Sequence, residues 1–169
     1  MNAAVVKDSN LFIDLELMGM THLWLQLPFR TVTTSLVVNE LEIGGHSLSL
    51  SLIRGGQIEE YLVQSDELFE LIESYSHLEL GETDLSVLLA AEKYEGMILS
   101  GDSALRKIAT ARKIEVHGTI WVLDELIKAE KITPVMAAER LDYLLSLKGA
   151  KRRFLPKSVC AARIEFWRK

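Results

Sequence analysis

Acidic residues follow two short apolar stretches of this sequence, at positions where a carboxylate can do chemistry. Asp8 comes directly after the β-type run AAVVK (3–7), and Asp102 comes shortly after the apolar stretch MIL (97–99). In open parallel sheets the working site lies beyond the carboxyl ends of the strands, so these two carboxylates converge if their strands are neighbours. Gathered carboxylates repel one another unless a cation lies among them. Oxygen ligands without Cys or His select Mg²⁺ or Mn²⁺ over zinc.

Two further acids are candidates for the same site. Asp84 lies in the first turn of a predicted helix, and Glu40 follows the β-branched run that starts at Thr31. A simpler interpretation stands beside this one, because Asp8, Asp84 and Asp102 all lie where a carboxylate stabilises a helix N-terminus. Taken singly, each acid is explained by capping. The hypothesis of a shared metal site depends on the joint pattern.

Strands and helices must alternate along the chain to bring these acids together. Short apolar runs predict the strands, and apolar residues spaced by three or four predict the helices between them. Such alternation implies right-handed crossovers and a sheet covered on both faces. We therefore expect an α/β fold with three α/β/α layers and a central, mainly parallel sheet. The expected strands are 3–7, the start of 31–42, 58–63, 96–100 and 114–118; helices are expected after Asp8, late in 31–42, around 68–75, after 82, after 103, and within 119–131, 134–148 and 159–168.

One segment between glycine pairs has a different pattern. GGHSLSLSLIRGGQ (44–57) alternates apolar and polar residues, which predicts a hairpin-like arm or a mobile loop. Near the other end, 149–158 is a break before a last short helix. We therefore divide the chain into a main domain, 1–147, and a basic helical extension, 148–169.

Composition excludes several classes of protein. The single cysteine, Cys160, excludes an intramolecular disulfide and a cysteine-rich zinc site, and the four histidines are scattered. Apolar stretches are broken well before a membrane-spanning length, and no secretory signal is visible, so we expect a cytoplasmic protein without a membrane. The net charge is −5, yet residues 148–169 carry eight Lys or Arg and one acid. This basic end either contacts a polyanion or pairs with the acidic body.

Four motifs, in register with the predicted strands, resemble those of the PIN-domain family of metal-dependent nucleases. VVKDSNLFIDLELMG is similar to the family opening and assigns Asp8 as the first acid, and LVVNEL resembles the motif that ends at the second acid, Glu40. LGETDLSVLLAAEK is similar to the helix opening that contains the third acid, which assigns Asp84 to this role and Glu82 as an accessory. LSGDSALRKIATARKIEVHGT is the most specific piece, and its matching positions are Ser100, Asp102 and Arg106.

The resemblance implies a Mg²⁺- or Mn²⁺-dependent endoribonuclease in which the four acids are catalytic metal ligands. Asn10 and Ser100 are then expected to bond a ligand water or a phosphate oxygen. It further implies that the chain belongs to the subgroup with an extended helical C-terminus and is the toxin of a toxin–antitoxin pair. The expected partners are then a small antitoxin protein and a second copy of the chain in a homodimer. The basic extension is the expected source of RNA attraction. Its proposed RNA-binding residues are Lys151, Arg152, Arg153 and Lys157.

Two departures from the family pattern leave alternatives open. Related sequences often carry a second acid beside the fourth one, where this chain has Gly101, and often a glycine where it has Trp121. A catalytically weak PIN-like module that binds RNA or protein is therefore a second hypothesis. The chain lacks the paired acids after the first strand and the lysine after the last strand that a phospho-acceptor receiver domain has. A Rossmann nucleotide binder lacks its glycine motif after any strand. The three tryptophans, Trp24, Trp121 and Trp167, either stack on bases or pack in a core.

Overall fold

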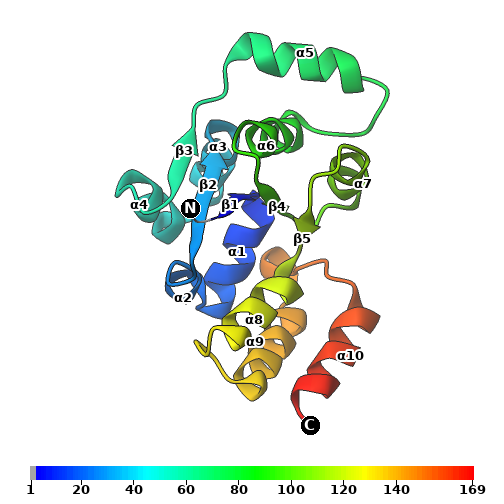
Figure 1. Cartoon of the computed structure of the whole chain (residues 1–169). Helices are drawn as coiled ribbons and strands as arrows, with labels where there is room; N and C mark the ends of the chain where they lie inside the picture. Colours follow the sequence, from blue (N-terminus) through cyan, green and yellow to red (C-terminus); the bar gives the residue numbers. More distant parts are fainter. Residues whose placement is uncertain (1–2) are drawn as a thin grey trace.

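A five-stranded parallel sheet forms the centre of the protein in the computed structural model, which describes residues 3–169 (Figure 1). The strand order is β3-β2-β1-β4-β5, and every neighbouring pair is parallel. The chain thus starts in the middle of the sheet, builds one half, and returns to build the other. This confirms the expected fold class. The strands are β1 (Ala3–Lys7), β2 (Phe29–Thr34), β3 (Glu59–Tyr61), β4 (Met97–Leu99) and β5 (Val116–His117).

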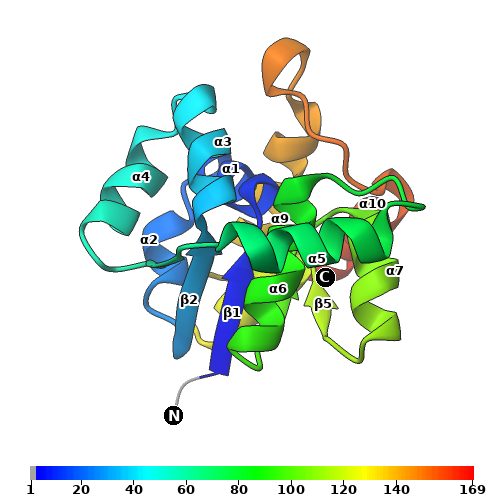
Figure 2. The ribbon, with the colours of Figure 1, turned by 90° about the horizontal axis from the view of Figure 1, so that it is seen from above.

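Helices cover both faces of the sheet, and their apolar sides form two separate cores (Figure 1). One core receives side chains from α1 (Ser9–Met18), α2 (Thr21–Trp24), α8 (Thr119–Lys128), α9 (Pro134–Ser146) and α10 (Lys157–Trp167). The other receives them from α3 (Ser35–Gly44), α4 (Ser47–Arg54), α6 (Glu82–Lys93) and α7 (Ser103–Ala111). Outside these layers, α5 (Ser65–Tyr75) crosses over α6, as Figure 2 shows.

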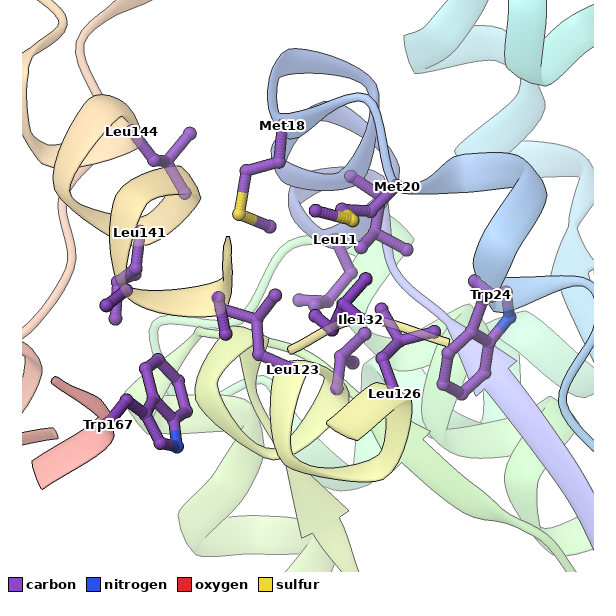
Figure 3. Close-up of a cluster of buried hydrophobic side chains, with 14 of the residues drawn as sticks. Leu11, Met18, Met20, Trp24, Leu123, Leu126, Ile132, Leu141, Leu144 and Trp167 are labelled. Atoms are coloured by element: carbon purple, nitrogen blue, oxygen red, sulfur yellow. The ribbon is translucent and has the colours of Figure 1, made fainter. Parts of the chain in front are cut away.

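Strand alternation divides the apolar residues between the two cores. In β1, Val5 belongs to the core of α1, α8 and α9, while Val6 belongs to the core of α3, α6 and α7. In β4, Leu99 and Ile98 are divided in the same way. Successive side chains of a strand point to opposite faces, so a doubly covered strand is apolar at every position. Figure 3 shows the first core, where α1, α8 and α9 meet.

Local signals in the sequence begin and end the helices that follow the strands. Asp8 and Asp102 are the N-caps of α1 and α7, and Thr34 is the N-cap of α3; each side chain accepts a hydrogen bond from a backbone N–H of the first turn. Gly19 ends α1 in the left-handed region, with φ of 69°, which glycine adopts without strain. The capping interpretation of Asp8 and Asp102 is therefore correct.

The prediction for residues 44–57 is wrong, because this segment contains the helix α4 rather than a hairpin or a loop. Leu is a strong helix former, and only one residue of the segment is β-branched, so the alternation did not specify a strand. The burial of Leu50, Leu52 and Ile53 places one side of the helix in the core. Ser49, which is also buried, donates its backbone N–H and its hydroxyl to Glu16 on α1. The short helix α2 was not predicted.

The C-terminal segment packs against the rest of the chain. After α9, a 3₁₀ turn (η1, Gly149–Lys151) leads through an extended stretch to α10, which lies against α9. Cys160, Ile164 and Trp167 are buried in the same core as α1 and α9. Across residues 3–169, no helix has both the length and the apolar character that crossing a membrane requires.

Candidate metal centre

Asp8 and the residues before Asp102 lie side by side, because β1 and β4 are neighbours in the sheet. The backbone N–H of Asp8 donates to the carbonyl of Leu99 at 3.0 Å. The order of the strands reverses between β1 and β4, and open α/β sheets bind their ligands at this kind of switch point. The structure thus confirms the condition on which convergence of the two acids depended.

Two serine hydroxyls connect Asp8 to its surroundings. Asp8 is 2% exposed, and its Oδ2 accepts a hydrogen bond of 2.8 Å from Ser100 Oγ. Ser9 Oγ lies 3.4 Å from Asp8 Oδ1 and donates to Glu40 Oε2 at 2.6 Å. Ser9 therefore lies between the first and second acids. Glu40 itself is exposed, in the second half of α3.

Asp102 is held by two contacts at the start of α7. Its Oδ1 accepts from the backbone N–H of Leu105 at 2.7 Å, and its own N–H donates to Ser100 Oγ at 3.1 Å. Ser100 thus contacts both Asp8 and Asp102. Capping occupies one carboxylate oxygen of each aspartate, since Asp8 Oδ1 accepts from the N–H of Ser9 at 2.7 Å.

Asp84 experiences the charge of the other three acids. Burial, followed by the negative charges of Asp8, Asp102 and Glu40, raises the pKa of Asp84 to about 6. Burial is also the main cause that raises the pKa of Asp8, and Glu40 adds to it. Asp8, Asp102 and Glu40 thus lie close enough to Asp84 to oppose the ionisation of its carboxyl group, and Glu40 opposes that of Asp8.

The donor set fits a hard divalent cation. Every candidate ligand is a carboxylate oxygen, which is the ligand that Mg²⁺ and Mn²⁺ prefer, and a bound cation relieves the repulsion among the acids. Within residues 3–169, no three His, Cys, Asp or Glu side chains are already spaced to hold a metal ion. Asp8, Asp102, Asp84 and Glu40 are the residues that would hold it, the last two directly or through water.

The accessory candidates have different environments in the structure. Ser100 is buried between Asp8 and Asp102, as described. Glu82 is exposed in the first turn of α6, two residues before Asp84. Arg106 donates its Nη1 to the carbonyl of Val116 at 2.6 Å, so its guanidinium is bound to the backbone of β5. Asn10 is exposed in the first turn of α1.

The four basic candidates of the C-terminal extension have two different environments. Lys151, Arg152 and Lys157 are exposed. Arg153 instead donates its Nε to Asp14 Oδ1 at 2.6 Å, and these two side chains are only 16% and 4% exposed. Arg153 Nη2 also lies 3.1 Å from the carbonyl oxygen and from Oδ1 of Asn10. Arg153 thus ties the extension to α1.

A family profile described as a PIN domain matches residues 4–168, which is nearly the whole chain. The chain belongs to the PIN-domain family. PIN domains are usually nucleases, and they generally use divalent metals such as Mg²⁺. In this PIN domain, Asp8 directly follows β1 and Asp102 begins the helix after β4, while Asp84 lies in the first turn of α6 and Glu40 in the second half of α3. No curated protein matches the chain in a sequence comparison.

Lys7 is a feature of this PIN domain that sequence reasoning missed. The residue ends β1 beside Asp8, its side chain is fully buried, and its Nζ lies 4.1 Å from the centre of the Phe12 ring. Among the described residues, Nζ has no hydrogen-bond partner. Burial lowers the pKa of Lys7 to about 7, although Glu16 and Asp14 oppose this shift. The only sequence signal was a lysine inside an otherwise apolar strand.

The tryptophans belong to the core of the PIN domain. Trp24 is 1% exposed and Trp167 is 5% exposed. Trp121 packs against that core and stacks on His117 with ring centres 4.3 Å apart. Core packing is therefore the correct alternative for Trp24 and Trp167, which cannot reach a base.

Proposed function

We propose that this PIN domain is a Mg²⁺- or Mn²⁺-dependent endoribonuclease. The observation that supports it is the position of Asp8, Asp102 and Glu40 near Asp84, at the side of the sheet where the adjacent strands β1 and β4 end. Burial, together with the charges of these three acids, raises the pKa of Asp84 to about 6. A divalent ion supplies positive charge that activates a water and stabilises charge on the phosphate during hydrolysis. We propose Asp8 and Asp102 as its principal ligands. Ser100 orients Asp8 through its hydrogen bond.

RNA attraction must come from outside the acidic group, because carboxylates repel phosphates. We assign it to the exposed Lys151, Arg152 and Lys157. Arg153 serves this surface indirectly, since its ion pair with Asp14 positions the segment that carries the other three. Removing residues 148–169 also removes part of the core, so single charge changes are the better test of RNA attraction.

The test is cleavage of a structured RNA by the purified full chain with Mn²⁺. We expect cleavage that leaves a 5′-phosphate, that a chelator stops, and that Asp8→Asn or Asp102→Asn abolishes. Asp66→Asn is a matched control, because Asp66 is an exposed acid in the first turn of α5, as Asp84 is in the first turn of α6. Cleavage that persists in Asp102→Asn or in the presence of chelator contradicts the proposal.

A catalytically weak binding module is the second candidate, and Gly101 favours it. A Cβ built on this exposed glycine meets nothing within 4 Å, so the chain has room for a second acid beside Asp102 but does not provide one. Binding of Mn²⁺ and RNA without turnover supports this candidate over the nuclease. Gly101→Asp is then expected to introduce or increase cleavage.

We further propose that the protein acts in the cytoplasm as a homodimeric toxin that a small antitoxin protein neutralises. This proposal comes from the likeness of its motifs to those of toxin-type PIN domains. A short neighbouring gene for a DNA-binding protein that co-purifies with this chain and suppresses cleavage supports it. Light scattering of the purified chain tests the dimer. Cleavage that persists when the protein encoded by the neighbouring gene is added contradicts the toxin–antitoxin proposal. A monomer in light scattering contradicts the homodimer.

A further inference from the structure

Phe154 is a large apolar side chain that the fold holds in solvent, and it lines the same surface hollow as Asp102. It is 85% exposed, and it lies in the extended stretch that joins η1 to α10 (orange to red in Figure 1). Its two neighbours are fixed. Arg153 is bound to Asp14 and Asn10, and Leu155 packs against the core. Because alternate side chains of an extended segment point to opposite sides, this double anchoring directs Phe154 outward.

Two hollows in the surface meet at Phe154. One, of about 310 Å³, extends to Asp102 and Gly101. The other, of about 400 Å³, lies between β5, α8 and α10 and is also lined by Gly101 and Phe154. A group that rests on the Phe154 ring is therefore within a few side chains of the proposed metal ligands.

The basic side chains beside this ring and in the larger hollow suit a polyanion, while the smaller hollow is lined by Asp14 and Asp102 as well as Arg153. Arg152 lies 4.9 Å above the Phe154 ring, and the larger hollow is lined by Arg106 and Arg163. Its one acid, Asp124, lies 3.4 Å from Arg163 and accepts a hydrogen bond from Trp167. An aromatic face beside arginines is the combination by which proteins bind unpaired bases and the phosphates that join them.

We propose that Phe154 is a stacking platform for an unpaired base of single-stranded RNA, which it positions beside the carboxylate group. This inference rests on the proposed nuclease function. It makes the C-terminal segment part of the substrate site, and it assigns base contact to Phe154 in place of Trp24 and Trp167, which are buried. An apolar peptide is the other ligand for such a ring. The three arginines around it favour RNA.

The experiment measures binding of a 12-nucleotide RNA of mixed, non-pairing sequence that carries fluorescein at one end. The full-length Asp8→Asn variant serves as the background, so that binding is measured without cleavage. Phe154→Ala is expected to weaken binding about 5- to 100-fold, because stacking of one base contributes about that factor. Phe154→Trp is expected to keep the affinity. Phe69→Ala, which removes an aromatic residue 59% exposed on α5, is the matched control and is expected to change nothing.

A second probe reports stacking directly. The fluorescence of the same RNA with a single 2-aminopurine is expected to fall when it binds the protein that has Phe154. It is expected to stay unchanged when the RNA binds the Phe154→Ala variant. The duplex form of the RNA, whose bases are already stacked, is expected to bind both proteins equally. If Phe154→Ala and Phe69→Ala bind the single strand equally, the stacking role is wrong while the nuclease proposal stands. If no variant binds RNA at all, both proposals fail.

Discussion

Ser100 Oγ donates a hydrogen bond of 2.8 Å to Asp8 Oδ2, and so joins the residue after β4 to the residue after β1. The same oxygen accepts the backbone N–H of Asp102 at 3.1 Å. One buried hydroxyl therefore orients the two acids that we propose as principal metal ligands. Substitution of residues that orient ligands in this way typically lowers metal affinity by about 10- to 100-fold.

Ser100→Ala is therefore expected to weaken Mn²⁺ binding by about 10-fold and to slow cleavage in proportion. Loss of the hydroxyl removes a bond that favours the ionised form of Asp8, so the pKa of Asp8 rises further above its usual range. Titration calorimetry with Mn²⁺ measures the affinity. Ser146→Ala, which removes an exposed hydroxyl in α9, is the control; equal affinities in the two variants contradict the orienting role.

The pKa of Asp84 predicts how the stability of the metal-free protein changes with pH. Burial and the neighbouring acids raise this pKa from 3.8 to about 6, so between these values the folded state holds a proton that the unfolded state has released. Asp84 therefore makes the free energy of unfolding fall as pH rises from about 4 to 6, and its full cost is present above pH 6. We expect Asp84→Asn to be more stable than the parent above pH 6 and to approach it near pH 4, as measured by urea unfolding.

Added Mn²⁺ is expected to reverse the order of stability of the parent and Asp84→Asn, so that the parent becomes the more stable protein above pH 6. The cation stabilises the ionised carboxylates, so it is expected to raise the melting temperature of the parent above pH 6 and much less below it, where Asp84 holds a proton. Asp84→Asn is expected to gain little at any pH. A parent protein whose melting temperature rises equally with Mn²⁺ at pH 5 and pH 8 excludes Asp84 as a ligand.

Most of the fold, and the positions of Asp8 and Asp102 at the carboxyl ends of two strands, were predictable from sequence. Apolar runs with an acid at the end indicated β1 and β4 and placed Asp8 and Asp102 at the same edge of the sheet. Neither apolar run indicated that β1 and β4 are neighbours in the sheet, because this pairing joins residues about ninety positions apart in the sequence. The helix α4 was missed because Ser and Leu alternate over six residues, 47–52, a run too short to decide between a strand and a helix.

The parts of the site that depend on distant contacts could not be predicted. Arg153 was grouped with Lys151, Arg152 and Lys157 because charge alone does not reveal a partner 139 residues away. The exposure of Phe154 follows from that same ion pair, since the anchored neighbour sets the direction of its side chain. Sequence thus indicated a basic extension, and tertiary contacts determine which of its side chains are free.

Arg153→Ala is expected to destabilise the protein by about 3 kcal/mol, because it leaves the buried Asp14 without its cation. Thr119 still donates a hydrogen bond of 2.6 Å to Asp14, which offsets only part of the loss. Urea unfolding measures the change. The double variant with Asp14→Asn is expected to recover part of the stability, because the unpaired charge is gone.

The control for this ion pair is Arg168→Ala. Arg168 pairs with Asp142 at 3.0 Å, but both side chains are more than half exposed, so its loss is expected to cost less than about 1 kcal/mol. A similar cost for Arg153→Ala and Arg168→Ala shows that the contact with Asp14 does not anchor the extension.

Lys7→Met is expected to stabilise the protein at neutral pH, by roughly 2–5 kcal/mol. The buried amino group has a pKa lowered from 10.5 to about 7, because burial opposes its charged form. The cost is complete below pH 7, where the folded and unfolded states both hold the proton. This cost decreases as pH rises from 7 to 10.5, because in that range only the unfolded state still holds the proton, and it vanishes above pH 10.5.

Urea unfolding of the parent and of Lys7→Met from pH 6 to pH 10.5 measures the difference in stability, which is expected to shrink steadily above pH 7. Lys107→Met, at an exposed position of α7, is expected to show no such trend. If Lys7→Met is the less stable protein at pH 7, the buried ammonium contributes to the fold through a contact beyond the Phe12 ring.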